Sequence, residues 1–163
     1  MKLLAVDPGN THTAFALMDD RTVRHADKLP NEVFLSQLRC GGAVAPLLPD
    51  ALVIEMVACY GMAVGREIFE TCVMIGRIEE CWQRRANIPA HRITRPEVKL
   101  TLCGTARAKD ANVRAKLIDL YGPGKAAAIG TRKTPGPLYG VAGDMWAAIA
   151  VGVAWQHRKA GAA

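Results

Sequence analysis

Residues 2–17 read KLLAVDPGNTHTAFAL, a pattern that predicts two short strands joined by a tight turn. The apolar run LLAV is typical of a strand buried on both faces of a sheet. Pro8 and Gly9 supply turn chemistry, and strand pairing breaks at Pro8 because proline has no amide hydrogen to donate. The first strand ends on Asp7, which is either an ordinary turn residue or a carboxylate held rigidly at a sheet edge to bind a metal ion. This stretch alone leaves both interpretations open.

The rest of the chain alternates strand-like and helix-like segments, which predicts a single α/β domain over residues 1–163. Asn31 is a candidate helix N-cap, and Thr94 with Glu97 forms a capping-box pattern. The last helix is almost wholly apolar and is expected to pack against the sheet. Further strands are predicted near 21–27, 51–54 and 90–93, helices over about 31–39, 64–86, 94–102, 110–120 and 141–157, and irregular structure over 122–140.

The composition is that of an ordinary globular protein, with 50% hydrophobic and 22% charged residues. No secretory signal is visible, and the longest apolar run, Met145 to Trp155, is too short to span a bilayer, so we expect no membrane association. The five cysteines are odd in number and form no C-x-x-C pair. This pattern argues against a disulfide framework or a zinc site and fits a reducing cytoplasm. Cys72 and Cys81 are expected to be small core residues.

Positive charge is concentrated in one part of the sequence. Residues 84–133 hold twelve Lys/Arg against three Asp/Glu, whereas the remainder holds nine against twelve. A basic segment beside an acidic remainder favours a polyanionic partner, with nucleic acid the first candidate. The alternative is a solvated basic face without a nucleic-acid partner.

Three acidic residues border the most buried predicted elements. Asp7 ends the first strand, Glu55 ends the strand near 51–54, and Asp144 is expected in the first turn of the apolar last helix. Each has a simpler explanation on its own: Glu55 can mark where a strand leaves the core, and Asp144 can be a helix N-cap. Buried together without a counterion, the three would strongly disfavour their ionised forms. Two divalent cations such as Mg²⁺ or Mn²⁺ would relieve that repulsion, and paired metals are a standard device for phosphodiester cleavage.

These acids belong to a series of segments that extends over nearly the whole chain. The segments are 5–10 (AVDPGN), 52–55 (LVIE), 67–69 with Gly76 and Arg77, 95–99, 103–110 (CGTARAKD) and 143–148 (GDMWAA). In this order and spacing the chain resembles the RuvC-type Holliday junction resolvases of the RNase H-like superfamily, particularly their phage-type members. The resemblance implies a mixed five-stranded sheet flanked by helices, a homodimer, and Mg²⁺-dependent nicking of two symmetric strands of a four-way DNA junction. Asp7, Glu55 and Asp144 match the catalytic acids of that family.

The sequence departs from the family at one position. The family carries a fourth ligand, Asp or His, three residues before the last aspartate, where this chain has Val141. Either the second metal is held more loosely or a fourth group comes from elsewhere, so the metal stoichiometry stays open. For the homodimer, helix 64–86 is the expected interface because it has more apolar residues than one sheet face needs: Ile68, Phe69, Cys72, Ile75 and Trp82.

Several cations are candidate DNA contacts. Arg107 and Lys109 precede a predicted helix, where backbone amides favour phosphate. The resemblance implicates Lys99, and Arg132 with Lys133 lies in a loop within reach of a phosphate. The alternative for each is a solvated surface cation.

Two further residues are assigned from their place in the chain. Tyr60 follows Glu55, where resolvases of this type place an aromatic side chain that wedges into the junction; its alternative is packing on the long helix. His12 in the opening turn either contacts phosphate or, as we expect, caps the turn.

The sequence therefore predicts a homodimeric, structure-selective endonuclease that acts on branched DNA. One alternative is a single-domain relative of actin-like ATPases and small-molecule kinases, whose phosphate-binding hairpin also reads Asp-x-Gly-x-Thr, as residues 7–11 do here. That class clamps ATP between two such domains, and 163 residues hold only one. The other alternative is a catalytically silent junction-binding module, which the absent fourth ligand permits. ATP binding separates the first alternative from the nuclease, and metal-dependent nicking separates the second.

Overall fold

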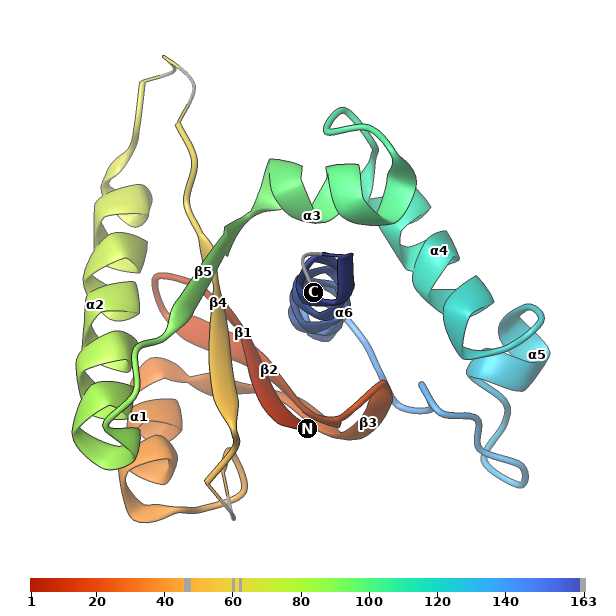
Figure 1. Cartoon of the computed structure of the whole chain (residues 1–163), viewed down its shortest axis with the longest axis horizontal. Helices are drawn as coiled ribbons and strands as arrows, with labels where there is room; N and C mark the ends of the chain where they lie inside the picture. The colour runs from red at the N-terminus through yellow and green to blue at the C-terminus, as the bar shows by residue number, and fades with distance from the viewer. Residues whose placement is uncertain (46–47, 60, 62, 162–163) are drawn as a thin grey trace.

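The computed structural model describes residues 1–45, 48–59, 61 and 63–161. Its centre is a five-stranded sheet with the strand order β3-β2-β1-β4-β5 (Figure 1). The strands are β1 (Lys2–Pro8), β2 (His12–Asp19), β3 (Thr22–Pro30), β4 (Ala51–Met56) and β5 (His91–Thr94). β1, β2 and β3 form an antiparallel meander, whereas β4 runs parallel to β1 and β5 runs parallel to β4. The sheet is therefore mixed, and the expected fold class is confirmed.

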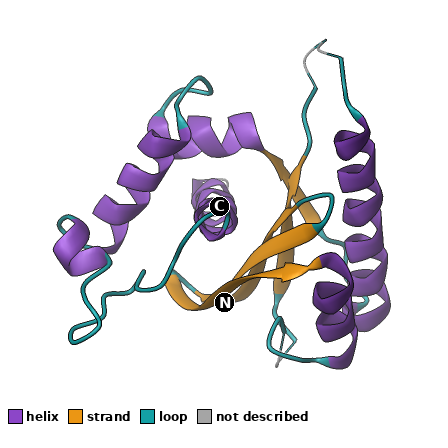
Figure 2. Cartoon of the chain, turned by 180° about the vertical axis from the view of Figure 1, so that it is seen from behind, coloured by secondary structure: helices purple, strands orange, loops and turns teal. Residues whose placement is uncertain are grey.

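Helices cover both faces of the sheet (Figures 1 and 2). One face carries α1 (Asn31–Cys40) and α2 (Arg66–Ala86), and the other carries α6 (Met145–Gly161). Three further helices form an arc around α6, namely α3 (Arg95–Cys103), α4 (Asp110–Tyr121) and the short α5 (Lys125–Ala128). None of the helices in the described ranges has the length and apolar character that crossing a membrane requires.

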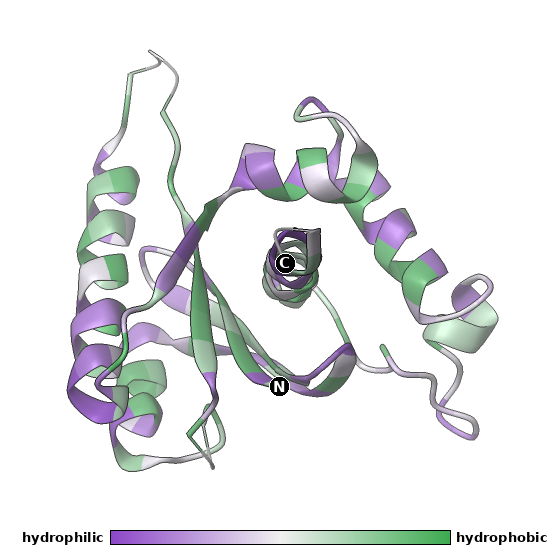
Figure 3. Cartoon of the chain, in the orientation of Figure 1, coloured by the Kyte–Doolittle hydropathy of each residue, from purple (hydrophilic) through white to green (hydrophobic). Residues whose placement is uncertain are grey.

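The pleat of β1 divides its buried residues between two cores. Leu4 and Val6 pack with α1 and α2, whereas Leu3 and Ala5 pack with α6. All four side chains are fully buried, which explains the unbroken apolar run in the sequence. Figure 3 shows that the interior strand β4 is also largely hydrophobic, whereas the edge strand β5 carries hydrophilic residues.

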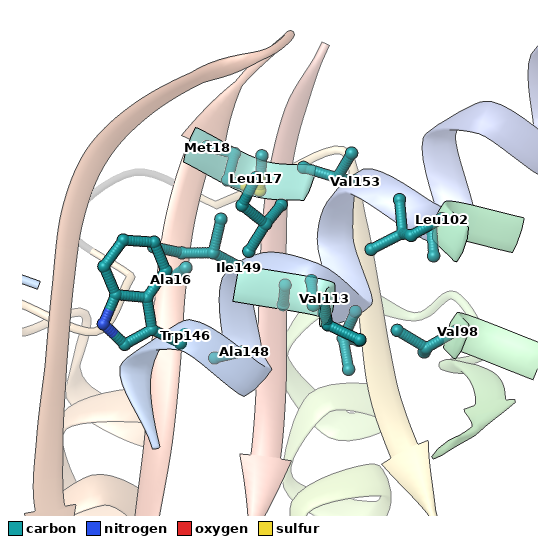
Figure 4. Packing of buried hydrophobic residues seen from close by; sticks show 14 of the residues in the cluster. Ala16, Met18, Val98, Leu102, Val113, Leu117, Trp146, Ala148, Ile149 and Val153 are labelled. Atoms are coloured by element: carbon teal, nitrogen blue, oxygen red, sulfur yellow. The ribbon is translucent and has the colours of Figure 1, made fainter. Parts of the chain in front are cut away.

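α6 lies very close to the sheet because one of its contacts is a glycine. A Cβ added at Gly152 would overlap the Met18 sulfur and lie 3.0 Å from the Ala5 Cβ. Figure 4 shows the α6 residues of this core packed against side chains of β2, α3 and α4; the labelled ones are Ala16, Met18, Val98, Leu102, Val113, Leu117, Trp146, Ala148, Ile149 and Val153. This dense packing fixes the position of the residue just before α6, which is Asp144.

Several local predictions need correction. α6 begins at Met145 rather than near 141, because the preceding residues form a turn in which Gly143 has a φ of 50°. Asp144 therefore precedes the helix, and its carbonyl accepts the amides of Ala147 and Ala148. Cys72 is exposed and not a core residue, whereas Cys81 is buried as expected. The 122–140 segment is irregular apart from α5.

Asn31 is the first residue of α1 and not its N-cap, which is Pro30. Its side-chain oxygen accepts the Thr13 hydroxyl at 2.8 Å, and its amide nitrogen donates to the carbonyls of Gly9 and Asn10, each at 3.0 Å. Asn31 thus ties down the turn that follows Asp7. The capping box at Thr94 and Glu97 is confirmed.

Candidate metal centre and nucleic-acid interface

The strand register brings two of the three predicted acids side by side. β1 and β4 are parallel neighbours, with Val6 opposite Ile54, so Asp7 and Glu55 are the next pair along these strands. Val6 and Ile54 both belong to the core under α1 and α2, and side chains alternate between the faces of a strand. Asp7 and Glu55 therefore lie on the opposite face, which α6 covers. Asp144 directly precedes α6, the helix that covers this face.

The electrostatics of Asp7 show that the three acids share one neighbourhood. The pKa of Asp7 is raised to about 7, chiefly by burial and next by the Glu55 carboxylate, while Arg95 opposes the rise. Asp144 also acts to raise this pKa, and Lys28 acts to lower it. Burial raises the pKa of Glu55 as well, against the opposing effect of Arg95. The fold thus keeps carboxylates together at the cost of their mutual repulsion.

Two cations that the sequence analysis did not single out contact these acids directly. The Nη1 atom of Arg95 lies 3.0 Å from Glu55 Oε2, and the Nζ atom of Lys28 lies 2.6 Å from Asp144 Oδ2. Arg95 directly follows β5, whose end lies beside the end of β4, so its place in the segment RPEVK was a usable signal. Lys28 had no such signal, because only the register of β3 brings it to the site.

Arg95 also links the acids to a second ion pair. Its Nη2 atom lies 3.2 Å from Asp110 Oδ1, and Lys99 Nζ lies 3.2 Å from the same oxygen. Burial acts to raise the pKa of Asp110, but Arg95 and Lys99 together hold it below its usual value. Lys99, a predicted DNA contact, is thus partly buried in an ionic network that leads from Asp110 to Glu55.

The three acidic side chains are of the type that binds a hard divalent cation, although they are not already arranged as a complete metal site. Within the described ranges, no three His, Cys, Asp or Glu side chains are close enough together to hold a metal ion. The groups that converge are nevertheless carboxylates, the ligands that Mg²⁺ and Mn²⁺ prefer, and their repulsion is what such an ion would relieve. Asp7, Glu55 and Asp144 are therefore the residues that would hold it.

The turn that holds Asp7 is rigid. The Gly9 amide donates to the His12 carbonyl at 2.9 Å, and a Cβ on Gly9 would lie 2.7 Å from that oxygen. Glycine is therefore required for this close approach. His12 is the first residue of β2, and its Nδ1 atom lies 3.1 Å from the hydroxyl of its neighbour Thr11; this contact leaves the turn-capping expectation a prediction.

The predicted DNA-binding cations do not form one cluster. Arg107 and Lys109 are exposed in the loop between α3 and α4, and Lys109 is the N-cap residue of α4. Arg132 and Lys133 are exposed between α5 and α6, well away from that loop in Figures 1 and 2. Tyr60 lies outside the described residues. The loop 104–109 lies at the same end of the molecule as the segment that follows β4, which is the end that carries Glu55.

A further cation lies beside Asp144. The Arg114 guanidinium carbon is 4.7 Å from the centre of the Trp146 ring, a cation–π contact that fixes the side chain over the start of α6. Both residues line a pocket of about 360 Å³ together with Arg95, Asp110, Gly143 and Asp144. The sequence analysis missed Arg114, because the contact depends on the packing of α4 against α6.

Comparisons with known proteins give the fold. No protein-family model matches the sequence, and no curated protein matches it. Among solved structures, Thermus thermophilus RuvC aligns over 99% of this chain and 97% of its own, with a TM-score of 0.67 and 15% identity. T. thermophilus RuvC in complex with Holliday junction substrate aligns over 99% and 96%, with a TM-score of 0.65 and 14% identity. The chain therefore has a RuvC-like fold of the RNase H-like type.

Proposed function

We propose that this protein is a structure-selective endonuclease that resolves four-way DNA junctions by divalent-metal-dependent hydrolysis with paired symmetric nicks. The observation that supports the proposal is electrostatic: Glu55 and Asp144 both act to raise the pKa of Asp7, and burial raises the pKa of Asp7 and Glu55. Carboxylates that repel one another lower the free energy of unfolding, and proteins keep such groups chiefly at functional sites. T. thermophilus RuvC, which shares the fold, has been seen bound to a Holliday junction.

Asp7, Glu55 and Asp144 are the residues that would hold Mg²⁺, with Mn²⁺ as its expected substitute. A bound divalent cation supplies charge stabilisation at a phosphodiester and lowers the pKa of water. The chain itself positions the ligands: β1 and β4 fix Asp7 and Glu55, α6 fixes Asp144, and Arg95 holds Glu55 in place. Lys99, Arg107, Lys109, Arg132 and Lys133 would engage the DNA backbone, and Tyr60 would contact the junction.

A four-way junction has twofold symmetry, and two symmetric cuts need two sites, so we propose a C2 homodimer. α2 is the proposed interface, because Phe69 and Val73 are 61% and 65% exposed on it, with Cys72 exposed between them. The interface set is corrected at two positions: Ile75 and Trp82 are buried in the core of the chain itself and are not available to a partner.

The proposal is tested by incubating the purified chain with a synthetic four-way junction and a matched duplex, with and without Mg²⁺. The expected result is paired nicking of the junction alone, and only with the metal. Asp7→Asn, Glu55→Gln and Asp144→Asn should each abolish nicking yet retain junction binding, because phosphate contacts set affinity while the metal does the chemistry.

Near-normal nicking by any one of these variants would remove that residue from the site. Junction binding without nicking by the wild type, at any Mg²⁺ or Mn²⁺ concentration, would instead identify a silent binding module. That outcome has a structural basis, since Glu55 and Asp144 are already paired with Arg95 and Lys28.

A further inference from the structure

The strand register places Lys28 in the same cross-strand row as Asp7. Asp7 is opposite Ala14 on β2, and Ala14 is opposite Lys28 on β3. Residues directly opposite one another in neighbouring strands project from the same face of a sheet, so Asp7 and Lys28 share the face that α6 covers. Ala14 between them is buried and has only a methyl group, so it leaves the long lysine side chain room to reach across. The 2.6 Å contact between Lys28 Nζ and Asp144 Oδ2 is the result.

We propose that the Lys28 ammonium takes the place of a second divalent cation, so that the site uses one divalent metal ion together with one lysine. The inference rests on the proposed function and specifies its chemistry. Of the three acids of the proposed function, Asp7 and Glu55 would then hold the metal ion, while Asp144 would hold Lys28. Lys28 would present its remaining N–H groups to a phosphate oxygen of the strand to be cut. An ammonium group has three donors and no acceptor, so contact with Asp144 leaves two donors for that oxygen.

The charge of the site supports this assignment. Three carboxylates face two protein cations, Lys28 and Arg95, which contact Asp144 and Glu55. One divalent ion would leave the site with a single net positive charge, which matches one phosphodiester. Two such ions would leave three positive charges, more than one phosphodiester neutralises.

The surroundings of Asp144 point the same way. Val141, at the position where a fourth acid is absent, is partly buried and packs against the α6 core. Its side chain offers a metal ion no oxygen. Lys28 also acts to lower the pKa of Asp7, so its field reaches a second acid beyond the one it contacts.

The decisive measurement is the number of Mn²⁺ ions bound per chain, counted by electron paramagnetic resonance on the DNA-free protein. We expect one Mn²⁺ in the wild type and in Lys28→Arg, which keeps the charge, and a second Mn²⁺ in Lys28→Gln, which frees Asp144. Arg24→Gln is the matched control, because it removes a charge from the same strand at an ion pair with Asp19, and it should still bind one. Circular dichroism verifies that each variant is folded.

Nicking kinetics give a second readout. The initial rate should depend on the first power of Mg²⁺ concentration in the wild type. Lys28→Gln should lose on the order of 10²-fold at low Mg²⁺, as for removal of one charge-stabilising donor, and should regain activity with the second power of Mg²⁺. A merely structural role for Lys28 would not give metal rescue.

Two Mn²⁺ ions in the wild type would overturn the inference, whether or not Lys28→Gln folds, and would leave the proposed nuclease intact. One Mn²⁺ in both the wild type and folded Lys28→Gln, with equal affinity and no metal rescue, would also overturn it. Failure of the wild type to bind Mn²⁺ and to nick the junction would instead refute the proposed function itself.

Discussion

Asp7 is the residue whose chemistry depends most on the fold. Glu55 and Asp144 both act to raise the pKa of its carboxylate, and no hydrogen bond from another described residue supports it. Burial and these neighbours raise its pKa from 3.8 to about 7. The folded state therefore binds the Asp7 proton more tightly than the unfolded state does. The free energy of unfolding should fall as the pH rises from about 4 to 7 and should stay low above that range.

Asp7→Asn should remove this penalty. In the absence of metal, the variant is expected to raise the free energy of unfolding at pH 8 by about 1–3 kcal/mol, less than the full ~4 kcal/mol that three pKa units represent. Near pH 4 the variant and the wild type should be nearly equal. Urea denaturation in EDTA at pH 4, 6 and 8 measures the difference.

Asp119→Asn, on the exposed side of α4, is the control and should show no such pH trend. Adding Mg²⁺ at pH 8 should stabilise the wild type more than Asp7→Asn, because an ion that binds only the folded state favours folding. Equal stability of Asp7→Asn and the wild type at pH 8 would show that Asp7 carries no electrostatic penalty.

At the scale of elements, the sequence predicted nearly every strand and helix, because each has a local signal. The apolar run of β1, the Gly41 stop after α1 and the capping box of α3 are examples. The burial of Asp7 and Glu55 at one edge of the sheet was predictable because both lie at the ends of apolar strands. Lys28 and Arg114 were not predictable, since their contacts with Asp144 and Trp146 depend on pairing and packing between segments far apart in the chain.

The errors on α2 have the same origin. Helical periodicity placed Ile68, Cys72 and Ile75 along one row, but it cannot say which row faces the sheet. The structure buries Met74, Ile75, Ile78, Cys81 and Trp82, and leaves Phe69, Cys72 and Val73 exposed. Exposed apolar residues in a contiguous group are typical of an interaction surface.

If that surface forms the dimer, Phe69→Asp combined with Val73→Asp should give a monomer, because two charges would be buried at the twofold interface. Light scattering at assay concentration measures the mass. Gln83→Asp, exposed further along the same helix, is the matched control and should leave the mass unchanged. A wild-type monomer that still makes paired symmetric nicks would refute the homodimer.

At the scale of the whole molecule, the basic residues and the three carboxylates come from different parts of the sequence. The basic segment 84–133 runs through β5, α3, α4 and α5 and so borders the acid site, whereas the acidic remainder contains the three carboxylates. A polyanion would therefore be attracted to the rim of the site before it meets the carboxylates. The cations at the rim differ in availability: Arg95 and Lys99 are engaged by acids, while Arg107 and Lys109 are exposed on the loop before α4.

Arg107 and Lys109 allow the sharpest test of this arrangement. Lys109 is the N-cap of α4, where the helix dipole adds to the attraction of both cations for phosphate. If both contact the DNA backbone, the Arg107→Ala, Lys109→Ala double variant should bind branched DNAs of different sequence more weakly by a similar factor. The slope of log affinity against log salt concentration should become shallower by about two, one for each lost contact. Residues that read bases would instead lose affinity for some sequences only.

The measurement is junction affinity at several salt concentrations for the wild type and the double variant. The comparison is the Arg132→Ala, Lys133→Ala double variant, which removes the same two charge types from a second proposed DNA contact, the distant loop between α5 and α6. A change of slope in the first variant alone would place the DNA along the α3–α4 loop, at the end of the molecule that carries Glu55. Equal changes in both would extend the contact to the far loop. Parallel lines for the wild type and the Arg107, Lys109 variant would show that these two residues do not engage phosphate.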